Sequence, residues 1–207
     1  MIAKLSIAAA GLSGAVALAL SAQGSPGSTL AVQVKDARGL PIKDAVVTIY
    51  PAAGVSVPKG FSWPNAMGQK DLAFVPGTLI VAKGSNVAFP NFDRVRHSVY
   101  SFSKPAKFEI NLYGSDQTRS QSFPIAGTVA VGCNIHDQMR GYIKVVDTPF
   151  AAKTDREGRV RFDGLPAGGA KVRIWYPSAV AADNEAEHAT SLNGGFNSRS
   201  VVLPLRG

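Results

Sequence analysis

The feature that most restricts the fold of this chain is a succession of short, β-branched and aromatic segments between residues 74 and 146. Turn-forming residues such as Gly84 and Gly114 separate most of these segments. Short strands at this spacing, with no segment of convincing helical period, are typical of a β-sandwich or β-barrel. We therefore predict an all-β fold, with Phe89, Tyr100 and Phe102 in the strand core and strands at 78–81, 86–89, 97–102, 107–112, 128–133 and 141–146.

The segments on either side of this run have a strand pattern of their own. Leu30, Val32 and Val34 alternate with small or polar residues, and 45–50 is rich in β-branched residues, so we expect these two segments to pair like a hairpin. With 207 residues, the chain is long enough for two small domains. The remaining expected elements are a connector at 51–71, two strands around a turn at 164–169, a short helix at 179–189 and a closing strand at 200–205.

Residues 1–22 have the pattern of a secretory signal. A single cation, Lys4, precedes an apolar stretch at 5–20, and small residues follow at Ser21 and Ala22, where we place the cleavage site. The stretch is shorter than the roughly 18 apolar residues expected of a membrane-spanning helix, although an uncleaved anchor is the alternative. We therefore expect an exported, periplasmic protein that does not span a membrane after cleavage.

The chain has one cysteine, Cys133, and therefore no intramolecular disulfide. The thiol is either free, paired with another molecule or bound to a metal. An oxidising compartment favours the metal-bound form, because a thiolate held by a metal is protected from oxidation.

The segment VGCNIHDQMRGY, at 131–142, contains the clearest candidate for chemistry. It places Cys133, His136 and Met139 three residues apart. A thiolate, an imidazole and a thioether form a soft ligand set that favours copper over calcium, magnesium or manganese. His97, in the upstream segment FPNFDRVRHSVYSF, is the candidate for a second imidazole. Two histidines, a cysteine and a weak axial methionine are the ligands of a blue-copper electron-transfer site.

Other site types fit the sequence less well. Structural zinc prefers cysteine and histidine without a thioether. A copper enzyme with a second copper ion would need further histidines, whereas the chain has three, and His188 lies in a polar stretch typical of a solvated surface. No Ser/His/Asp arrangement, phosphate loop or dinucleotide fingerprint is present, so we do not expect an enzyme.

The chain is basic, with a formal net charge of +8 that falls to +7 when Lys4 leaves with the signal. The cations are scattered and form no run interleaved with aromatic residues, so we do not expect nucleic acid as a partner. Such a charge can steer the protein toward an acidic partner.

The pattern FxPxxLxVxxGxxVxFxN at 74–91, followed by His97 and the Cys133 loop, resembles the cupredoxins of the plastocyanin branch. The spacing around His136 is similar to that of amicyanin. The resemblance covers about 69–147. It implies a Greek-key β-sandwich and one type 1 copper ion held by His97, Cys133, His136 and Met139.

Two positions depart from the cupredoxin pattern. The residue after the first ligand histidine is commonly Asn in cupredoxins and is Ser98 here, which predicts a weaker tie to the ligand loop. Asp137 follows the second histidine, with Gln138 and Arg140 nearby, so we expect a polar rim around His136. By charge, Asp137 would favour protonation of His136 in the reduced state.

The flanks resemble a different module. Segment 30–51 and the pattern TDxxGxxxxxxLPxG from Thr154 are similar to carboxypeptidase-regulatory or transthyretin-like modules of Ig-like fold. The strings RHSVYSFS, GCNIHDQMRGY and VVDTPFAAKTDREG are similar to exported methylamine-utilisation-like proteins. We expect the cupredoxin domain at 69–147 to be inserted into one Ig-like module formed by 29–52 and 148–207; two separate modules are the alternative.

These inferences together predict an exported type 1 copper protein that carries single electrons. Its redox partner would be an acidic cytochrome or copper oxidoreductase. One alternative is a copper chaperone or resistance protein that uses the same ligands for Cu(I). Another is a non-redox Ig-like scaffold with a structural metal.

Overall fold

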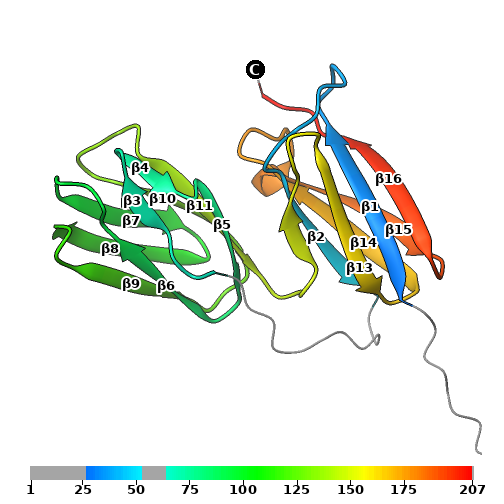
Figure 1. Cartoon of the computed structure of the whole chain (residues 1–207), viewed down its shortest axis with the longest axis horizontal. Coiled ribbons are helices and arrows are strands. Elements are labelled where there is room, and N and C mark those ends of the chain that lie inside the picture. The colour runs from blue at the N-terminus through cyan, green and yellow to red at the C-terminus, as the bar shows by residue number, and fades with distance from the viewer. Residues whose placement is uncertain (1–26, 53–63, 207) are drawn as a thin grey trace, which may run out of the picture.

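The computed structural model describes residues 27–52 and 64–206, and in this part of the chain it is an all-β protein of two lobes (Figure 1). Within 27–52 and 64–206, the single helical element is a 3-10 turn, η1 (Ala182–Asn184). No helix within the described ranges is long and apolar enough to cross a membrane. The expected signal at 1–22 and part of the connector at 51–71 lie outside the described residues.

The central lobe contains the strands between the two flanks. A five-stranded sheet has the order β5-β11-β10-β7-β8, and two antiparallel pairs of strands, β3-β4 and β6-β9, accompany it. Strand β5 runs parallel to β11, and the other pairs are antiparallel. The six strands predicted in this region are confirmed. The elements are β3 (Gly68–Lys70), β4 (Ala73–Val75), β5 (Thr78–Ala82), β6 (Ser85–Pro90), β7 (His97–Ser103), β8 (Ala106–Tyr113), β9 (Thr118–Phe123), β10 (Gly127–Gly132) and β11 (Arg140–Val146).

Inward-facing side chains of the sheet and of the β6-β9 pair form the core of the central lobe. Phe89 is fully buried, as predicted, whereas Phe102 is 80% exposed and the prediction that it lies in the core is wrong. Alternation along β7 explains the difference, because Val99 and Ser101 face inward and Tyr100 and Phe102 share the outer face. There the two aromatic rings pack against each other with centroids 5.2 Å apart.

The outer lobe is built by strands from both flanks. One of its sheets has the order β13-β1-β16 and the other has the order β12-β2-β14-β15. Because strands that precede the central lobe hydrogen-bond with strands that follow it, we propose that the flanks form one domain. Its strands are β1 (Ser28–Lys35), β2 (Val46–Pro51), β12 (Ala151–Lys153), β13 (Arg159–Leu165), β14 (Gly168–Trp175), β15 (Glu185–Leu192) and β16 (Phe196–Val202).

Two predictions for the outer lobe are wrong. Strands β1 and β2 do not form a hairpin, because β1 pairs with β13 and β16 whereas β2 pairs with β12 and β14. The first four residues of β2 are buried, which suits a central strand with a neighbour on each side. The expected helix at 179–189 is η1 followed by β15, whose backbone pairs with β14 along eight residues and so overrides local helix propensity.

A small apolar cluster joins the two lobes. Its buried members are Val46, Ile80, Val146, Ala151 and Trp175. A salt bridge of 2.8 Å between Lys144 on β11 and Glu185 on β15 lies at the same junction. Strand β11 therefore runs from the predicted metal-binding loop, at one end, to the contact with the outer lobe at the other.

Candidate metal centre

The fold brings together three of the four predicted ligands. His97 begins β7, Cys133 directly follows β10, and His136 lies in the loop between β10 and β11. The Cys133 Sγ lies 3.8 Å from His97 Nδ1 and 3.7 Å from His136 Nδ1. The ligand atoms of the three residues all lie within 4.8 Å of one another, and no other such His, Cys, Asp or Glu group occurs in 27–52 and 64–206.

Backbone hydrogen bonds hold the ligand loop closed. The Cys133 N–H donates to the Met139 carbonyl at 3.3 Å, and the Met139 N–H donates to the His136 carbonyl at 2.8 Å. Gly132 and Arg140 are paired across the base of the loop. Met139 is 1% exposed and packs in the core of the central lobe, so the loop turns its side chain inward. The role of Met139 as axial ligand stays a prediction.

His97 is oriented by Asp93. The His97 ring is fully buried, and its Nε2 lies 2.8 Å from Asp93 Oδ2. Because an ionised carboxylate only accepts hydrogen bonds, Nε2 carries a hydrogen, and in the neutral imidazole the lone pair is then on Nδ1, the nitrogen near Cys133 Sγ. A carboxylate that holds the outer nitrogen of a ligand histidine is a common arrangement in metal sites.

Asp93 is itself held by the β3–β4 turn. Its carboxylate accepts hydrogen bonds from the Asp71 N–H at 2.7 Å and the Leu72 N–H at 3.0 Å. Both turn residues have left-handed backbones, with φ of +54° and +57°, which directs their N–H groups toward the carboxylate. Burial raises the pKa of Asp93, but the hydrogen bonds from Leu72, His97 and Asp71 outweigh it and hold this pKa below its ordinary value. Asp93 is therefore ionised beside the ligand.

Ser98 braces the ligand loop despite its short side chain. Its Oγ accepts a hydrogen bond from the Asn134 N–H at 2.9 Å and lies 3.7 Å from Cys133 Sγ. The expected contact between this position and the loop is therefore present. On the other side of the loop, the ring of Tyr100 covers Gly132, where a Cβ atom would approach the ring to 2.8 Å.

A buried polar network supports β7 at its first residue, His97. Tyr113, which pairs with His97, donates a hydrogen bond to the Phe89 carbonyl at 2.7 Å and accepts one from the Gln69 side chain. Burial raises the pKa of Tyr113 to about 12. Asn91 donates to the Tyr113 carbonyl at 3.2 Å, which ties the loop before His97 to this network.

The rim of the site is mixed rather than uniformly polar. Phe92 and Ile135 are 65% and 51% exposed on the two loops that carry the histidines, while Asp137 and Arg140 are exposed nearby. Between Asp137 and His136 there is no ion pair or side-chain hydrogen bond among the described residues, and Arg140 donates to the Asp137 carbonyl at 3.2 Å. The predicted effect of Asp137 on His136 stays a prediction.

His188 does not belong to the site. It lies on β15 in the outer lobe, opposite Val172. The prediction of a solvated surface residue is wrong for its ring, since the side chain is half-buried and Nε2 is buried with no hydrogen-bond partner among the residues that the structure describes.

The donor set fits copper. One sulfur and two imidazole nitrogens converge, two of the three residues are buried, and the third is half-buried. Soft sulfur with imidazole selects copper or zinc over hard cations, and a buried thioether in the same loop is a ligand type that suits Cu(I). Sequence analysis missed Asp93, although an acidic residue four positions before His97 is a signal for such a partner.

Many solved structures are similar to this chain, and the similarity of the three that follow is of limited extent. The chain matches no protein-family model and no curated protein. A reduced amicyanin mutant is 23% identical over 50% of this chain and 99% of its own, with a TM-score of 0.37. A purple cupredoxin from Nitrosopumilus maritimus is 18% identical over 39% of this chain and 98% of its own, with a TM-score of 0.36. A copper-containing nitrite reductase from Thermus scotoductus SA-01 is 23% identical over 47% of this chain and 25% of its own, with a TM-score of 0.38.

Proposed function

We propose that this protein is a cupredoxin-like carrier of single electrons with one type 1 copper ion. The observation that carries the proposal is the convergence of His97, Cys133 and His136, whose ligand atoms lie within 4.8 Å of one another. Met139, from the same loop as Cys133 and His136, is the proposed axial ligand. This set of two histidines, one cysteine and one weak axial methionine is typical of electron-transfer copper.

When bound, copper would supply a one-electron change between Cu(II) and Cu(I). The protein residues would contribute a site that does not rearrange. Asp93 holds the His97 ring, Ser98 holds the loop at Asn134, and the Met139 backbone closes the loop onto Cys133. Since these contacts need no metal, the ligands are arranged in advance and electron transfer requires little movement.

His136 is the proposed route for electrons to and from a partner. It is the one half-buried residue of the three, and the loop around it is exposed on both sides. Arg94, Arg96 and Arg140 are exposed on the same two loops. Their charges favour an acidic partner, such as an acidic cytochrome or copper oxidoreductase, by electrostatic steering. We propose export to the periplasm as the setting in which such a partner is met.

We propose electron transfer without catalysis. A second copper ion would need histidines beyond His97 and His136, and His188, the third histidine of the chain, lies in the other lobe. A single copper ion is sufficient for a carrier, which accepts and passes on one electron at a time.

Titration of the purified, metal-free protein with Cu(II) tests the proposal. We expect an intense blue thiolate band at one copper per chain and no band in Cys133→Ala. A matched control, Ser101→Ala, changes a buried polar residue of β7 outside the ligand group and should retain the band. Absence of the band in folded wild-type protein would refute the assignment. Irreversible loss of the metal during voltammetry would favour a Cu(I) chaperone instead.

A further inference from the structure

The turn between β15 and β16 contains the sequence Asn193–Gly194, which belongs to the outer lobe and takes no part in the proposed metal centre. Figure 1 shows β16 on the side of the outer lobe away from the central lobe. Asn193 and Gly194 are both exposed. Exposed turns of small and polar residues are the places where a folded chain is most accessible to reagents. The side chain of Asn193 and the backbone of Gly194 are therefore open to solvent.

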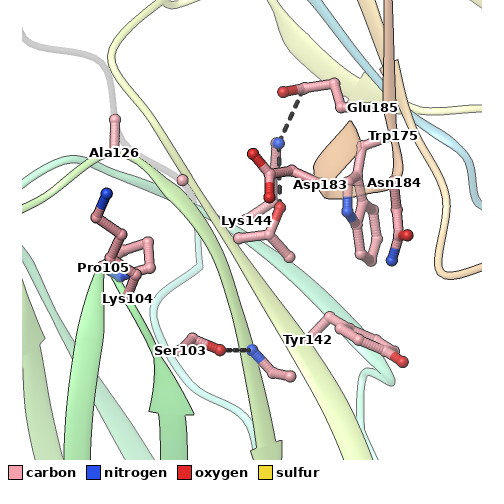
Figure 2. A pocket seen from close by; sticks show the side chains of 13 residues that line it. Ser103, Lys104, Pro105, Ala126, Tyr142, Lys144, Trp175, Asp183, Asn184 and Glu185 are labelled. Carbon is pink, nitrogen blue, oxygen red and sulfur yellow. Dashed lines mark hydrogen bonds and ion pairs between the residues drawn. The ribbon is translucent and has the colours of Figure 1, made fainter. Parts of the chain in front are cut away.

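Asn193 differs from most asparagines of the chain because its side chain is not restrained. Six of the eight asparagines have side chains that take part in hydrogen bonds. One of these is Asn184 at the junction of the lobes (Figure 2), whose amide donates to the Pro177 carbonyl at 3.0 Å. The six are Asn65, Asn86, Asn91, Asn134, Asn184 and Asn197. Within 27–52 and 64–206, the side chains of Asn111 and Asn193 make no hydrogen bond, and Asn193 takes part through its backbone alone.

Asn111 and Asn193 differ in the residue that follows each of them. Asn111 precedes Leu112 within β8, whereas Asn193 precedes Gly194 in a turn. The Gly194 nitrogen donates no backbone hydrogen bond in the part of the chain that the structure describes. Because glycine has no Cβ atom, its nitrogen is also more accessible than that of Leu112. Of the eight asparagines, Asn193 is therefore the one that combines a free side chain with an accessible nitrogen in the next residue.

Although its side chain is free, the backbone of Asn193 is a point of attachment within the outer lobe. Its N–H donates to Asn197 Oδ1 at 3.1 Å, and its carbonyl accepts hydrogen bonds from Asn197 Nδ2 at 2.9 Å and from Ser28 Oγ at 2.9 Å. Ser28 is the first residue of β1. The Asn193 carbonyl therefore joins the turn between β15 and β16 to the start of β1, and a change in the main chain at this residue would alter that connection.

We propose that Asn193 is a site of spontaneous deamidation in the folded protein. The Gly194 nitrogen loses its proton to a solvent base and attacks Cγ of Asn193, so that a new C–N bond closes a five-membered succinimide ring. The side-chain amide takes up a proton and leaves as ammonia. Attack within one chain needs no second molecule to be brought into position. Water then opens the ring, and the reaction involves no oxidation or reduction and no copper.

The opening of the ring gives two products with different effects on the main chain. Cleavage between Cγ and the nitrogen gives aspartate with an ordinary backbone. Cleavage between the Asn193 carbonyl carbon and the nitrogen gives isoaspartate, in which the main chain runs through Cβ and Cγ and this carbonyl becomes part of a free carboxylate. Both products add one negative charge at the turn. We expect isoaspartate to weaken the connection to Ser28 and Asn197 more than aspartate does, because it moves their shared acceptor out of the main chain.

Incubation of the full-length, metal-free protein in mildly alkaline ¹⁸O-water, followed by peptide mass spectrometry, tests this site. We expect the amide of Asn193 to be replaced by ¹⁸O-labelled carboxylate, in two products of equal mass that separate on chromatography. Asn111, which is exposed and also has a free side chain, and Asn197, which lies near the same turn but is held by hydrogen bonds, are the internal controls and should keep their amides. No loss at Asn193, or equal losses at the three asparagines, would overturn the proposal.

A pair of variants identifies the attacking nitrogen. Gly194 does not have a left-handed backbone, and a Cβ atom there would meet no atom within 4 Å, so Gly194→Ala should retain the fold. The added methyl group hinders the approach of the nitrogen to Cγ, and we expect the loss of amide at Asn193 to slow several-fold. Gly169→Ala adds the same group elsewhere in the outer lobe, at an ordinary contact of 3.8 Å with Ala52 Cβ, and should leave the rate unchanged. Equal rates in the two variants would contradict attack by the Gly194 nitrogen.

Discussion

Replacing Asp93 by Asn separates the role of the carboxylate from the role of the loop that carries it. In the protein, one carboxylate serves three donors, which are His97 Nε2 at 2.8 Å and the N–H groups of Asp71 and Leu72 at 2.7 and 3.0 Å. Asn has the same shape but one oxygen and an amide that donates. At least one of the three hydrogen bonds must therefore be lost, together with the negative charge.

The expected magnitude follows from these contacts. Loss of a partner that orients a ligand histidine typically lowers metal affinity about 10- to 100-fold. The negative charge of Asp93 favours Cu(II) over Cu(I), because Cu(II) has the larger positive charge. If the loss falls on Cu(II) alone, the reduction potential rises by about 59 mV for each tenfold loss in affinity. We therefore expect Asp93→Asn to raise the potential by about 60–120 mV.

Voltammetry of the copper-loaded wild type, Asp93→Asn and Asp137→Asn measures this effect. Asp137 is next to His136, so its replacement removes the same charge near the site without removing a side-chain hydrogen bond to a ligand ring. We expect the control to shift the potential by much less than Asp93→Asn. If the two shifts are equal, charge alone acts and the argument from the His97 hydrogen bond is refuted.

Two further predictions concern the axial ligand and the outer lobe. Met139→Leu should raise the reduction potential, by about 59 mV for each tenfold loss of Cu(II) affinity relative to Cu(I), while the blue band persists; an unchanged potential would exclude Met139 as a ligand. Burial and the Asp147 carboxylate raise the pKa of Tyr50 to about 12 despite the opposing charge of Arg173, whose guanidinium carbon lies 4.7 Å from the Tyr50 ring centroid. A tyrosine whose pKa is raised on folding contributes stability below pH 10, the pKa of an ordinary tyrosine, and this contribution disappears as the pH rises toward 12, its pKa in the folded protein. Because the phenol is partly exposed, we expect the free energy of unfolding to fall by about 1–2 kcal/mol more in wild type than in Tyr50→Phe between pH 9 and 12. Denaturant titrations at the two pH values measure this difference. Equal decreases in the two proteins would contradict a raised pKa of Tyr50.

Features of the fold that depend on contacts distant in sequence were not predictable from local patterns. The β-branched character of 45–50 indicates a strand, but its neighbours β12 and β14 begin about a hundred residues later. Strand β9 was not predicted because one of its six residues, Phe123, is buried, so its apolar pattern is too weak to recognise. The segment 185–192 has residues that suit a helix, and pairing with β14 makes it a strand.

For the candidate site too, one part was predictable from the sequence and another depends on the tertiary structure. Cys133, His136 and Met139 share one short loop, so their spacing alone identified a soft ligand set, and His97 followed from the scarcity of histidine in the chain. The convergence of His97 with that loop depends on the pairing of β7 with β10, through Tyr100 and Gly132. The pairing of Asp93 with His97 is recognised only in the structure, where the N–H groups of the β3–β4 turn hold the Asp93 carboxylate.

By itself, the sequence determined the all-β class, the central strands and the identity of the residues able to bind a soft metal, because these follow from side-chain chemistry and from alternation along short segments. The tertiary structure alone decided which strands are neighbours, which carboxylate holds His97, and which side chains join the two lobes. The physical reason is that hydrogen-bond partners and burial are properties of residues brought together in space, and many of these residues are far apart along the chain.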